Sequence, residues 1–222
     1  MKGLNRARVA LLACAVAIMP VACAITTASA SAITFGFEGE LIQVGGPNGL
    51  SVGDTFTGSF SYTVEQAGTS VPAVTPGQVS HYAFDSYSLT IQGQTVSSTG
   101  GDLSIWNNTS LGDRFHLTAD LTTPSALVTG SINGAPATQL FLALAALSGD
   151  PFMNMSLPAA LNLADFPDLK RVDVIFSPGN GAVIGEITNL SVVPLPSAGW
   201  LFIPGLSSFF LWRMRTERRA AS

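Results

Sequence analysis

Apolar and polar residues alternate with a period of two along most of the middle of this chain. The clearest example is residues 55–64, TFTGSFSYTV, in which Phe56, Phe60 and Tyr62 share one parity while serine and threonine fill the other. Successive side chains of a β-strand point to opposite faces, so this pattern predicts a strand with one apolar face and one face of hydroxyl groups. Strands with one wet face belong to antiparallel sheets, because parallel sheets bury both faces. Similar runs occur at residues 34–41, 86–91, 115–121 and 172–176.

Clusters of glycine, proline and asparagine separate these runs. Asn133-Gly134 supplies the positive φ angles that a tight hairpin requires, so residues 125–132 and 137–147 are predicted to pair. Counting the runs gives about ten short strands in a single domain. The sequence therefore predicts an all-β fold, an antiparallel β-sandwich of jelly-roll-like topology.

Three segments fit the alternation less well. Residues 140–147 are apolar on both parities, which indicates either a fully buried central strand or a short helix, and we favour the strand. Residues 157–166 are expected to be an irregular connection that faces the core and holds one helical turn. Residues 65–78, with two prolines, are expected to be the longest irregular connection.

The N-terminal 30 residues have the three parts of a signal peptide. Three bases within the first eight residues precede an apolar run over 9–25, and Ala28-Ser29-Ala30 provides the small-x-small site cut by signal peptidase. We expect cleavage after Ala30, or else after Ala32. Cys23 offers a lipoprotein site as an alternative, although Pro20 stands where that site would carry leucine.

The C-terminal 30 residues have the composition of a short membrane anchor. Residues 196–212 are apolar, and as a helix they would span about 25 Å, slightly less than a bilayer core. Trp200 and Trp212 flank this segment as interfacial aromatics do. The alternative is a buried C-terminal helix of the domain. Four bases follow the apolar segment: Arg213, Arg215, Arg218 and Arg219. By the positive-inside rule, they place the C-terminus in the cytoplasm.

The tail resembles the PEP-CTERM sorting signal of exported proteins of Gram-negative bacteria. The resemblance lies in the order of three parts, which are Val193-Pro194-Leu195-Pro196, the apolar segment and the basic end. It covers about residues 193–219, with Leu195 where glutamate is commonest in the family. It implies that exosortase, a membrane protease, removes the tail from a precursor held transiently in the inner membrane. Such tails have also been labelled after the C-terminus of ice-binding proteins.

These ends divide the chain into a signal peptide over 1–30, a β-sandwich domain over 31–192 and a sorting signal over 193–222. The middle contains no cysteine, so disulfide bonds cannot stabilise it. It holds three bases and 13 of the chain's 14 acidic residues, a net charge of −10. This charge argues against nucleic acid and anionic membrane surfaces as partners.

The middle offers few groups for catalysis or metal binding. His81 and His116 are its only histidines, with no cysteine and no His-x-His, so no zinc site is predicted, and each is interpreted as a surface or hydrogen-bonded structural histidine. No Gly-x-Ser-x-Gly motif is present, and the carboxylates are scattered singly. A calcium ion near Asp102 or Asp113 stays an alternative. We therefore predict no catalytic, cofactor-binding or metal-binding residues, and no enzyme.

Three functions follow as hypotheses. We prefer an exported, non-catalytic protein of the cell surface or extracellular matrix, whose wet serine and threonine face, with tyrosine and Trp106 nearby, contacts polysaccharide. The partner is implied by the resemblance, because exosortase genes accompany exopolysaccharide production and biofilm formation. The first alternative is a secreted hydrolase of matrix polysaccharide, which would need paired carboxylates with raised pKa values. The second is an ice-binding protein, which would need a flat, repeated threonine array.

Overall fold

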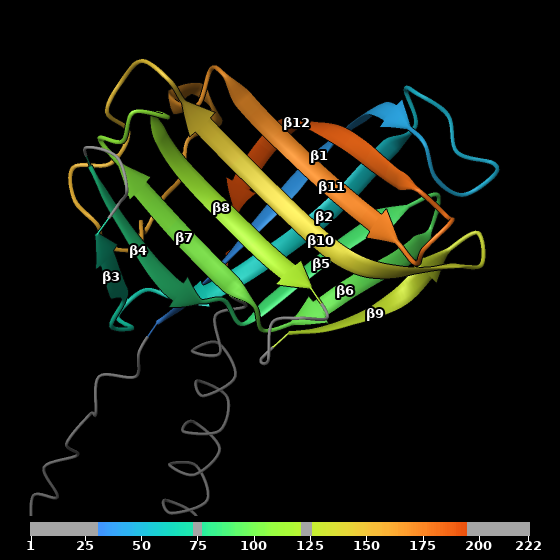
Figure 1. Cartoon of the computed structure of the whole chain (residues 1–222), viewed down its shortest axis with the longest axis horizontal. Coiled ribbons are helices and arrows are strands. Elements are labelled where there is room, and N and C mark those ends of the chain that lie inside the picture. The colour runs from blue at the N-terminus through green and yellow to red at the C-terminus, as the bar shows by residue number, and fades with distance from the viewer. Residues whose placement is uncertain (1–30, 73–76, 121–125, 195–222) are drawn as a thin grey trace, which may run out of the picture.

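The computed structural model describes residues 31–72, 77–120 and 126–194. These residues form twelve strands and one 3₁₀ helix, η1, over Leu163–Asp165. The strands are β1 Ala32–Val44, β2 Thr55–Thr63, β3 Thr69–Pro72, β4 Gln78–Ala83, β5 Ser86–Ile91, β6 Gln94–Thr99, β7 Asp102–Asn107, β8 Asp113–Asp120, β9 Leu127–Ile132, β10 Ala135–Ala146, β11 Leu169–Phe176 and β12 Ala182–Val192. Every strand pairing is antiparallel, which confirms the predicted all-β, antiparallel class (Figure 1).

The strands close into a flattened barrel. Eight strands form the closed ring in the order β11-β12-β1-β2-β5-β6-β9-β10, and β10 pairs with β11 to complete it. Strands β8, β7, β4 and β3 continue from β10 as a flap, so that β11, β10, β8, β7 and β4 face the viewer in Figure 1. A jelly roll has two separate sheets, whereas here one hydrogen-bonded sheet returns to itself. The cause is the length of β10, whose first residues pair with β9 and whose remainder pairs with β8 and β11.

Aromatic side chains fill the space between the two sides of the barrel. The alternation predicted for β1 and β2 is present, since Phe35 and Phe60 are both 0% exposed. Their ring centroids lie 5.1 Å apart, and Phe60 lies 5.7 Å from Phe115 of β8 on the opposite side. Clustered aromatic rings bury large areas and prefer such separations. One core therefore supports both outer surfaces.

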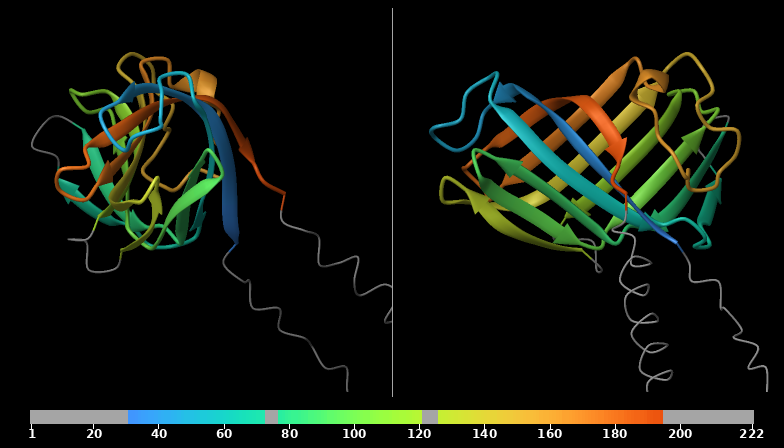
Figure 2. Two further views of the ribbon diagram at one scale, coloured as in Figure 1. Left: turned by 90° about the vertical axis from the view of Figure 1, so that its right-hand side faces the viewer. Right: turned by 180° about the vertical axis from the view of Figure 1, so that it is seen from behind.

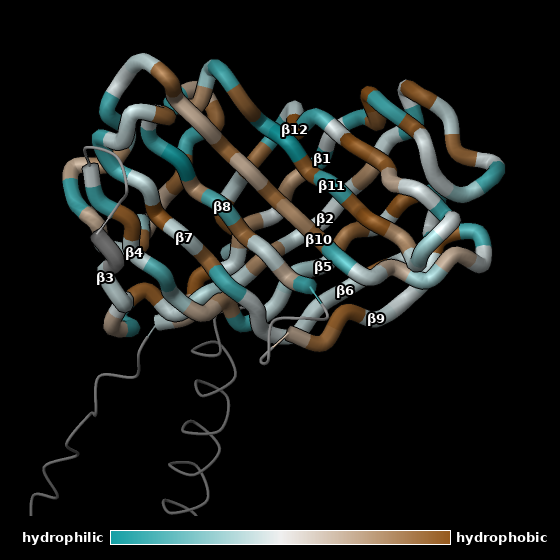
Figure 3. The backbone as a smooth tube through the Cα atoms, in the orientation of Figure 1, coloured by the Kyte–Doolittle hydropathy of each residue, from teal (hydrophilic) through white to brown (hydrophobic). Residues whose placement is uncertain are grey.

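Residues 140–147 form a strand over most of their length, as we favoured. Strand β10 has neighbours on both edges, and Leu140, Leu142 and Leu144 are fully buried. Its opposite parity is half-buried at Phe141 and Ala143, which explains why the sequence is apolar on both parities. In Figure 3, β10 is brown over most of its length, whereas β8 carries teal segments.

Two other sequence predictions have mixed outcomes. The Asn133-Gly134 hairpin is confirmed, with φ of 48° and 81° at these residues, but β9 and β10 pair over only two residue pairs before β10 turns to other partners. The prediction of an irregular connection over 65–78 is wrong for Thr69–Pro72, which form the edge strand β3 beside β4. Four residues ending in proline were too short to show a period. The connection over 157–166 is as expected, with Phe166 buried and one turn of 3₁₀ helix.

The two ends of the described domain lie side by side. Strand β12 runs antiparallel to β1 and pairs Val192 with Phe35, and the N–H of Val193 donates to the Thr34 carbonyl oxygen at 2.8 Å. Both ends therefore leave the barrel on the same side (Figure 2). Residues 31–72, 77–120 and 126–194 contain no helix of the length and apolarity needed to cross a membrane.

Candidate functional site

A pocket of about 380 Å³ opens on the outer face of β8, β10 and β11, and we call it the outer pocket. This volume lies within the range of about 300–1,000 Å³ that is usual for small-ligand sites. Its lining combines two aromatic rings, small or aliphatic side chains and an ion pair. The lining residues are His116, Phe141, Ala143, Leu169, Arg171, Asp173 and Ile175.

Strand register brings these residues together from distant parts of the sequence. On β10, Ala143 pairs with His116 of β8 on one edge and with Arg171 of β11 on the other. Two residues earlier, Phe141 pairs with Asp173 of β11. Paired residues in an antiparallel sheet project to the same face, so all five side chains lie outside the barrel. The methyl group of Ala143 leaves space between its larger neighbours.

An ion pair forms one wall of the outer pocket. Asp173 accepts hydrogen bonds from Nε of Arg171 at 2.5 Å and from Nη2 at 2.7 Å. The two residues are two apart in β11 and therefore share a face. The hydrogen bond to Asp173 raises the pKa of Arg171, so the guanidinium stays charged. Such a two-point contact fixes the orientation of both groups.

Two aromatic rings form the other wall. The ring planes of His116 and Phe141 are nearly parallel, at 10°, with centroids 6.1 Å apart. Burial lowers the pKa of His116 and Arg114 lowers it further, while Asp102 and Asp173 oppose the change. The net lowering keeps this imidazole uncharged at neutral pH. His116 therefore contributes an uncharged ring rather than a cation.

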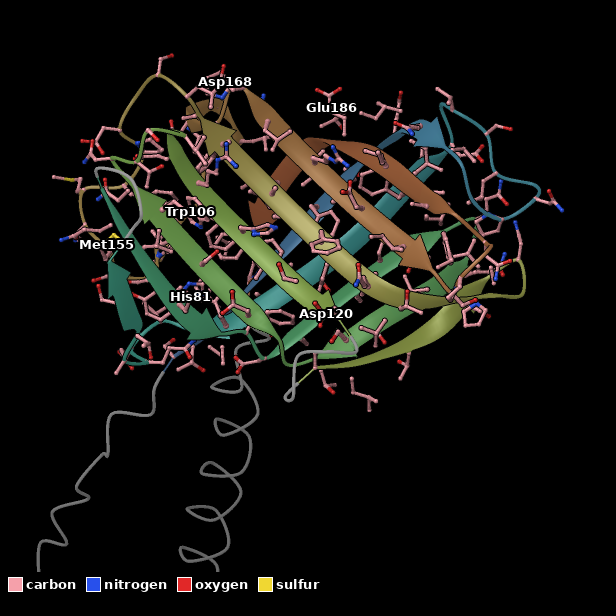
Figure 4. The ribbon with its side chains drawn as sticks, viewed as in Figure 1. His81, Trp106, Asp120, Met155, Asp168 and Glu186 are labelled. Carbon is pink, nitrogen blue, oxygen red and sulfur yellow. The ribbon has the colours of Figure 1, made fainter. Side chains whose placement is uncertain are left out.

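The same face continues over β7 and β4. Ser104 pairs with both His116 and His81, and the indole N–H of Trp106 donates to Ser104 Oγ at 3.1 Å. The Arg114 guanidinium lies 5.7 Å from the Trp106 ring centre, within cation–π range. Figure 4 shows Trp106 and His81 on this side of the molecule.

His81 lies in β4, and its Nδ1 is 3.0 Å from both carboxylate oxygens of Asp102. This contact matches the hydrogen-bonded structural histidine expected from the sequence.

The opposite side of the barrel carries the hydroxyl face, the outer face of β2, β5, β6 and β9. Strand register aligns Ser59, Ser88, Ser97 and Thr129 in one row. Neighbouring hydroxyl groups bond to each other, as in Ser59 to Ser88 at 3.0 Å and Ser97 to Thr129 at 3.2 Å. The other two pairs are Ser61 with Ser86 at 2.7 Å and Thr90 with Thr95 at 2.8 Å.

The predicted polysaccharide surface, a serine and threonine face with tyrosine and Trp106 nearby, is wrong in its aromatic part. Tyr62 and Tyr87 are 0% exposed and point into the barrel. Tyr82 donates to the carbonyl oxygen of Met155. Trp106 lies on β7, away from the hydroxyl face. Alternation showed which side chains share a strand face, but it could not show which strands are neighbours.

The carboxylates give the hydrolase hypothesis little support. Asp113 is 1% exposed and accepts hydrogen bonds from the backbone N–H groups of Asn108 at 2.7 Å and Phe152 at 3.4 Å. Burial raises the pKa of Asp113, and nearby Asp150 raises it further. These bonds hold two loops together, and neither carboxylate lines the outer pocket. Among the described residues, no group of three or more histidine, cysteine or acidic side chains could hold a metal ion.

The processing signals lie mostly outside the described residues. Val193 and Pro194 follow β12, and Val193 is still hydrogen-bonded to β1. The remaining predicted positions lie beyond the described ranges and stay predictions: Ala28, Ala30, Leu195, Pro196, Trp200, Trp212, Arg213, Arg215, Arg218 and Arg219.

Comparison of the chain with protein-family models, with curated proteins and with solved structures gave no match.

Proposed function

We propose that this chain is an exported, non-catalytic protein of the cell surface or extracellular matrix that associates with exopolysaccharide. A signal peptide would direct its export. The tail would anchor the precursor in the inner membrane, with the β domain in the periplasm, until exosortase removes it. Jelly-roll topology is not part of this proposal, since the barrel closes through β10 and β11.

The observation that carries the proposal is the adjacency of the domain's two ends. Val192 pairs with Phe35, and paired strands lie about 4.8 Å apart. A leader before Ser31 and an anchor after Pro194 therefore both reach one membrane without unfolding any strand. A domain whose ends emerged from opposite sides would need a longer linker at one end to satisfy both signals.

The test of sorting is deletion of residues 200–222 in a host that carries an exosortase. We expect the domain to be released from the membrane fraction, and we expect the full chain to keep its tail in an exosortase knockout. The measurement is the mass of the recovered protein in each fraction. An unchanged processed mass in the knockout would contradict the exosortase route. Replacing only residues 220–222 serves as a control that leaves the four arginines in place.

The hydroxyl face provides one observation in favour of ice binding. Its rows of serine and threonine repeat at strand spacing, as an ice-binding array would. However, serine outnumbers threonine in the row from Ser59 to Thr129, and these hydroxyl groups already bond to one another. Twisted strands also keep such a face from being flat. Thermal hysteresis measured with the full chain would distinguish this function, and we expect none.

A further inference from the structure

We propose that the outer pocket binds a neutral oligosaccharide, with one sugar ring stacked against His116 and Phe141 and its adjacent hydroxyl groups bonded to the Arg171 and Asp173 pair. This inference rests on the proposed function, because it names the surface and the class of polysaccharide that the protein would contact.

The stacking wall suits the apolar face of a sugar. A pyranose ring presents C–H groups on its face and hydroxyl groups around its edge. Aromatic side chains provide a large apolar surface with few rotatable bonds. Phe141 and His116 are both half-buried, so their rings are held by the strands while one side remains open to the pocket. The uncharged state of His116 favours an apolar contact over an ionic one.

The ion-pair wall suits the hydroxyl groups at the edge of the same ring. A guanidinium has about five N–H donors and a carboxylate has about four acceptor positions. The contact between Arg171 and Asp173 uses two of each. The donors and acceptors left over lie beside each other on one rigid unit. Two adjacent sugar hydroxyl groups can therefore accept from the guanidinium and donate to the carboxylate at the same time.

The charges favour a neutral sugar over an acidic one. Asp173 compensates the charge of Arg171, and its side chain is 19% exposed against 42% for the arginine. Arg114, the other arginine of the described residues, donates to the Leu111 carbonyl oxygen and lies over Trp106. The net charge of −10 on residues 31–193 repels a uronate chain at long range.

The polar hollow on the other side of the barrel is a weaker candidate. It measures about 220 Å³ and lies beside Gly36, Glu38 and Asn189. The amide of Asn189 donates to Glu38 at 2.8 Å, which ties its two main polar side chains together. Phe37 is the one aromatic residue in its lining, and this side chain is 4% exposed and belongs to the core, so it offers little surface for stacking.

The test is calorimetric titration of the full chain, purified in detergent, with cellohexaose, laminarihexaose, mannohexaose and oligogalacturonate. We expect at least one neutral hexasaccharide to bind. Phe141→Ala should weaken this binding about tenfold or more, as loss of an aromatic contact does. Phe141→Tyr should retain it within about twofold, because the ring persists.

Two further variants keep the test independent of the stability of the Phe141 variant. Ala143→Leu fills the floor of the pocket with both walls unchanged, and Arg171→Lys keeps the charge but loses the two-point contact. Each should weaken binding about tenfold. Thr57→Leu is the matched control, an exposed residue on the outer face of β2, and it should leave binding unchanged. The thermal unfolding temperature of each variant reports whether it folds.

Several results would overturn the inference. These are no binding of any neutral hexasaccharide, binding of oligogalacturonate alone, full binding by folded Ala143→Leu, or an equal loss in Thr57→Leu. If the chain binds the host's own exopolysaccharide while the pocket variants behave as wild type, the proposed function stands and the outer pocket is excluded. If the chain is not exported and binds no polysaccharide, both proposals are wrong.

Discussion

The outer pocket and the hydroxyl face arise from the same two-residue alternation but differ in what they present. On the hydroxyl face, the hydroxyl groups of neighbouring strands satisfy each other, as Ser59 and Ser88 do at 3.0 Å. In the outer pocket, two aromatic rings and an ion pair surround Ala143. The ion pair of Arg171 and Asp173 uses only part of its hydrogen-bonding capacity. Chemical capacity for a ligand therefore depends on strand neighbours and on side-chain size, and the number of polar residues on a face is a poor guide to it.

The two faces are connected through the buried tyrosines between them. Tyr87 belongs to β5 of the hydroxyl face, yet its phenol donates to the backbone carbonyl of Phe141, beneath the outer pocket, at 3.0 Å. Tyr62 of β2 donates to the Pro158 carbonyl at 2.7 Å. Any change that removes the Tyr87 proton should disturb both faces together, and loss of the Tyr62 proton should loosen the connection between β10 and β11.

Alkaline pH should give the largest effect. Burial raises the pKa of Tyr62 and of Tyr87, and it also raises that of Tyr82. The pKa of each of these tyrosines is therefore higher in the folded protein than in the unfolded chain, where it is about 10. The stabilisation is complete below this unfolded pKa and is lost as the pH rises toward the folded-state pKa. Because Tyr62 and Tyr87 are both 0% exposed, the loss grows with each pH unit above the unfolded pKa, by up to about 1.4 kcal/mol for each tyrosine that stays un-ionised in the folded state. Phenolate absorbance and circular dichroism should therefore change together above about pH 10.

A control sharpens this result. The double variant Tyr62→Phe and Tyr87→Phe removes both titrating groups while keeping the rings, so its unfolding should move to higher pH. If phenolate absorbance from both tyrosines appeared near their ordinary pKa with the strands still intact, the burial of these tyrosines would be refuted.

The shared core should give the next largest effect. The ring centroid of Phe60 lies 5.1–6.2 Å from those of Phe35, Phe37 and Tyr62. It lies 5.7 Å from the ring centroid of Phe115 across the barrel. Phe60→Ala should lower the free energy of unfolding by about 3–5 kcal/mol, the usual cost of such a cavity. Chemical denaturation monitored by fluorescence measures it.

The exposed Thr57→Ala on the same strand is the control, and it should change stability by less than about 0.5 kcal/mol. Equal effects of Phe60→Ala and Thr57→Ala would mean that the faces of β2 are assigned the wrong way round.

The sequence was sufficient for local structure and insufficient for the candidate site. Alternation around Phe56 and Phe60 predicted which face is buried, and Asn133-Gly134 predicted a turn, because these depend on neighbouring residues alone. The outer pocket depends on β10 lying between β8 and β11, which joins His116 to Arg171 through Ala143. The one local sign of the outer pocket was a small residue, Ala143, on the same half-buried face of β10 as Phe141.

The barrel closure was hidden for a related reason. Pairing of β10 with β9, β8 and β11 in turn is a property of the whole topology, and the apolar run at 140–147, although it favoured a strand, did not show which strands would be its neighbours. The Tyr62 and Tyr87 positions were not subject to this limit, although tyrosine occurs both in cores and on wet surfaces. Their parity with Phe60 and Leu89 was the signal that they point inward.

The smallest predicted effect compares one polar pair from each face. Double-mutant cycles should give a coupling energy of about 0.2–0.5 kcal/mol for Ser59 with Ser88 and about 0.5–1 kcal/mol for Arg171 with Asp173. Only the second pair is ionic, so raising the salt concentration from about 0.05 M to about 1 M, which shortens the screening length roughly fourfold, should reduce its coupling alone. Alanine at each position and denaturation at both salt concentrations supply the measurement. A salt-sensitive Ser59 and Ser88 coupling, or a larger one than that of the ion pair, would remove the distinction between a self-satisfied face and a face with unused hydrogen-bonding capacity.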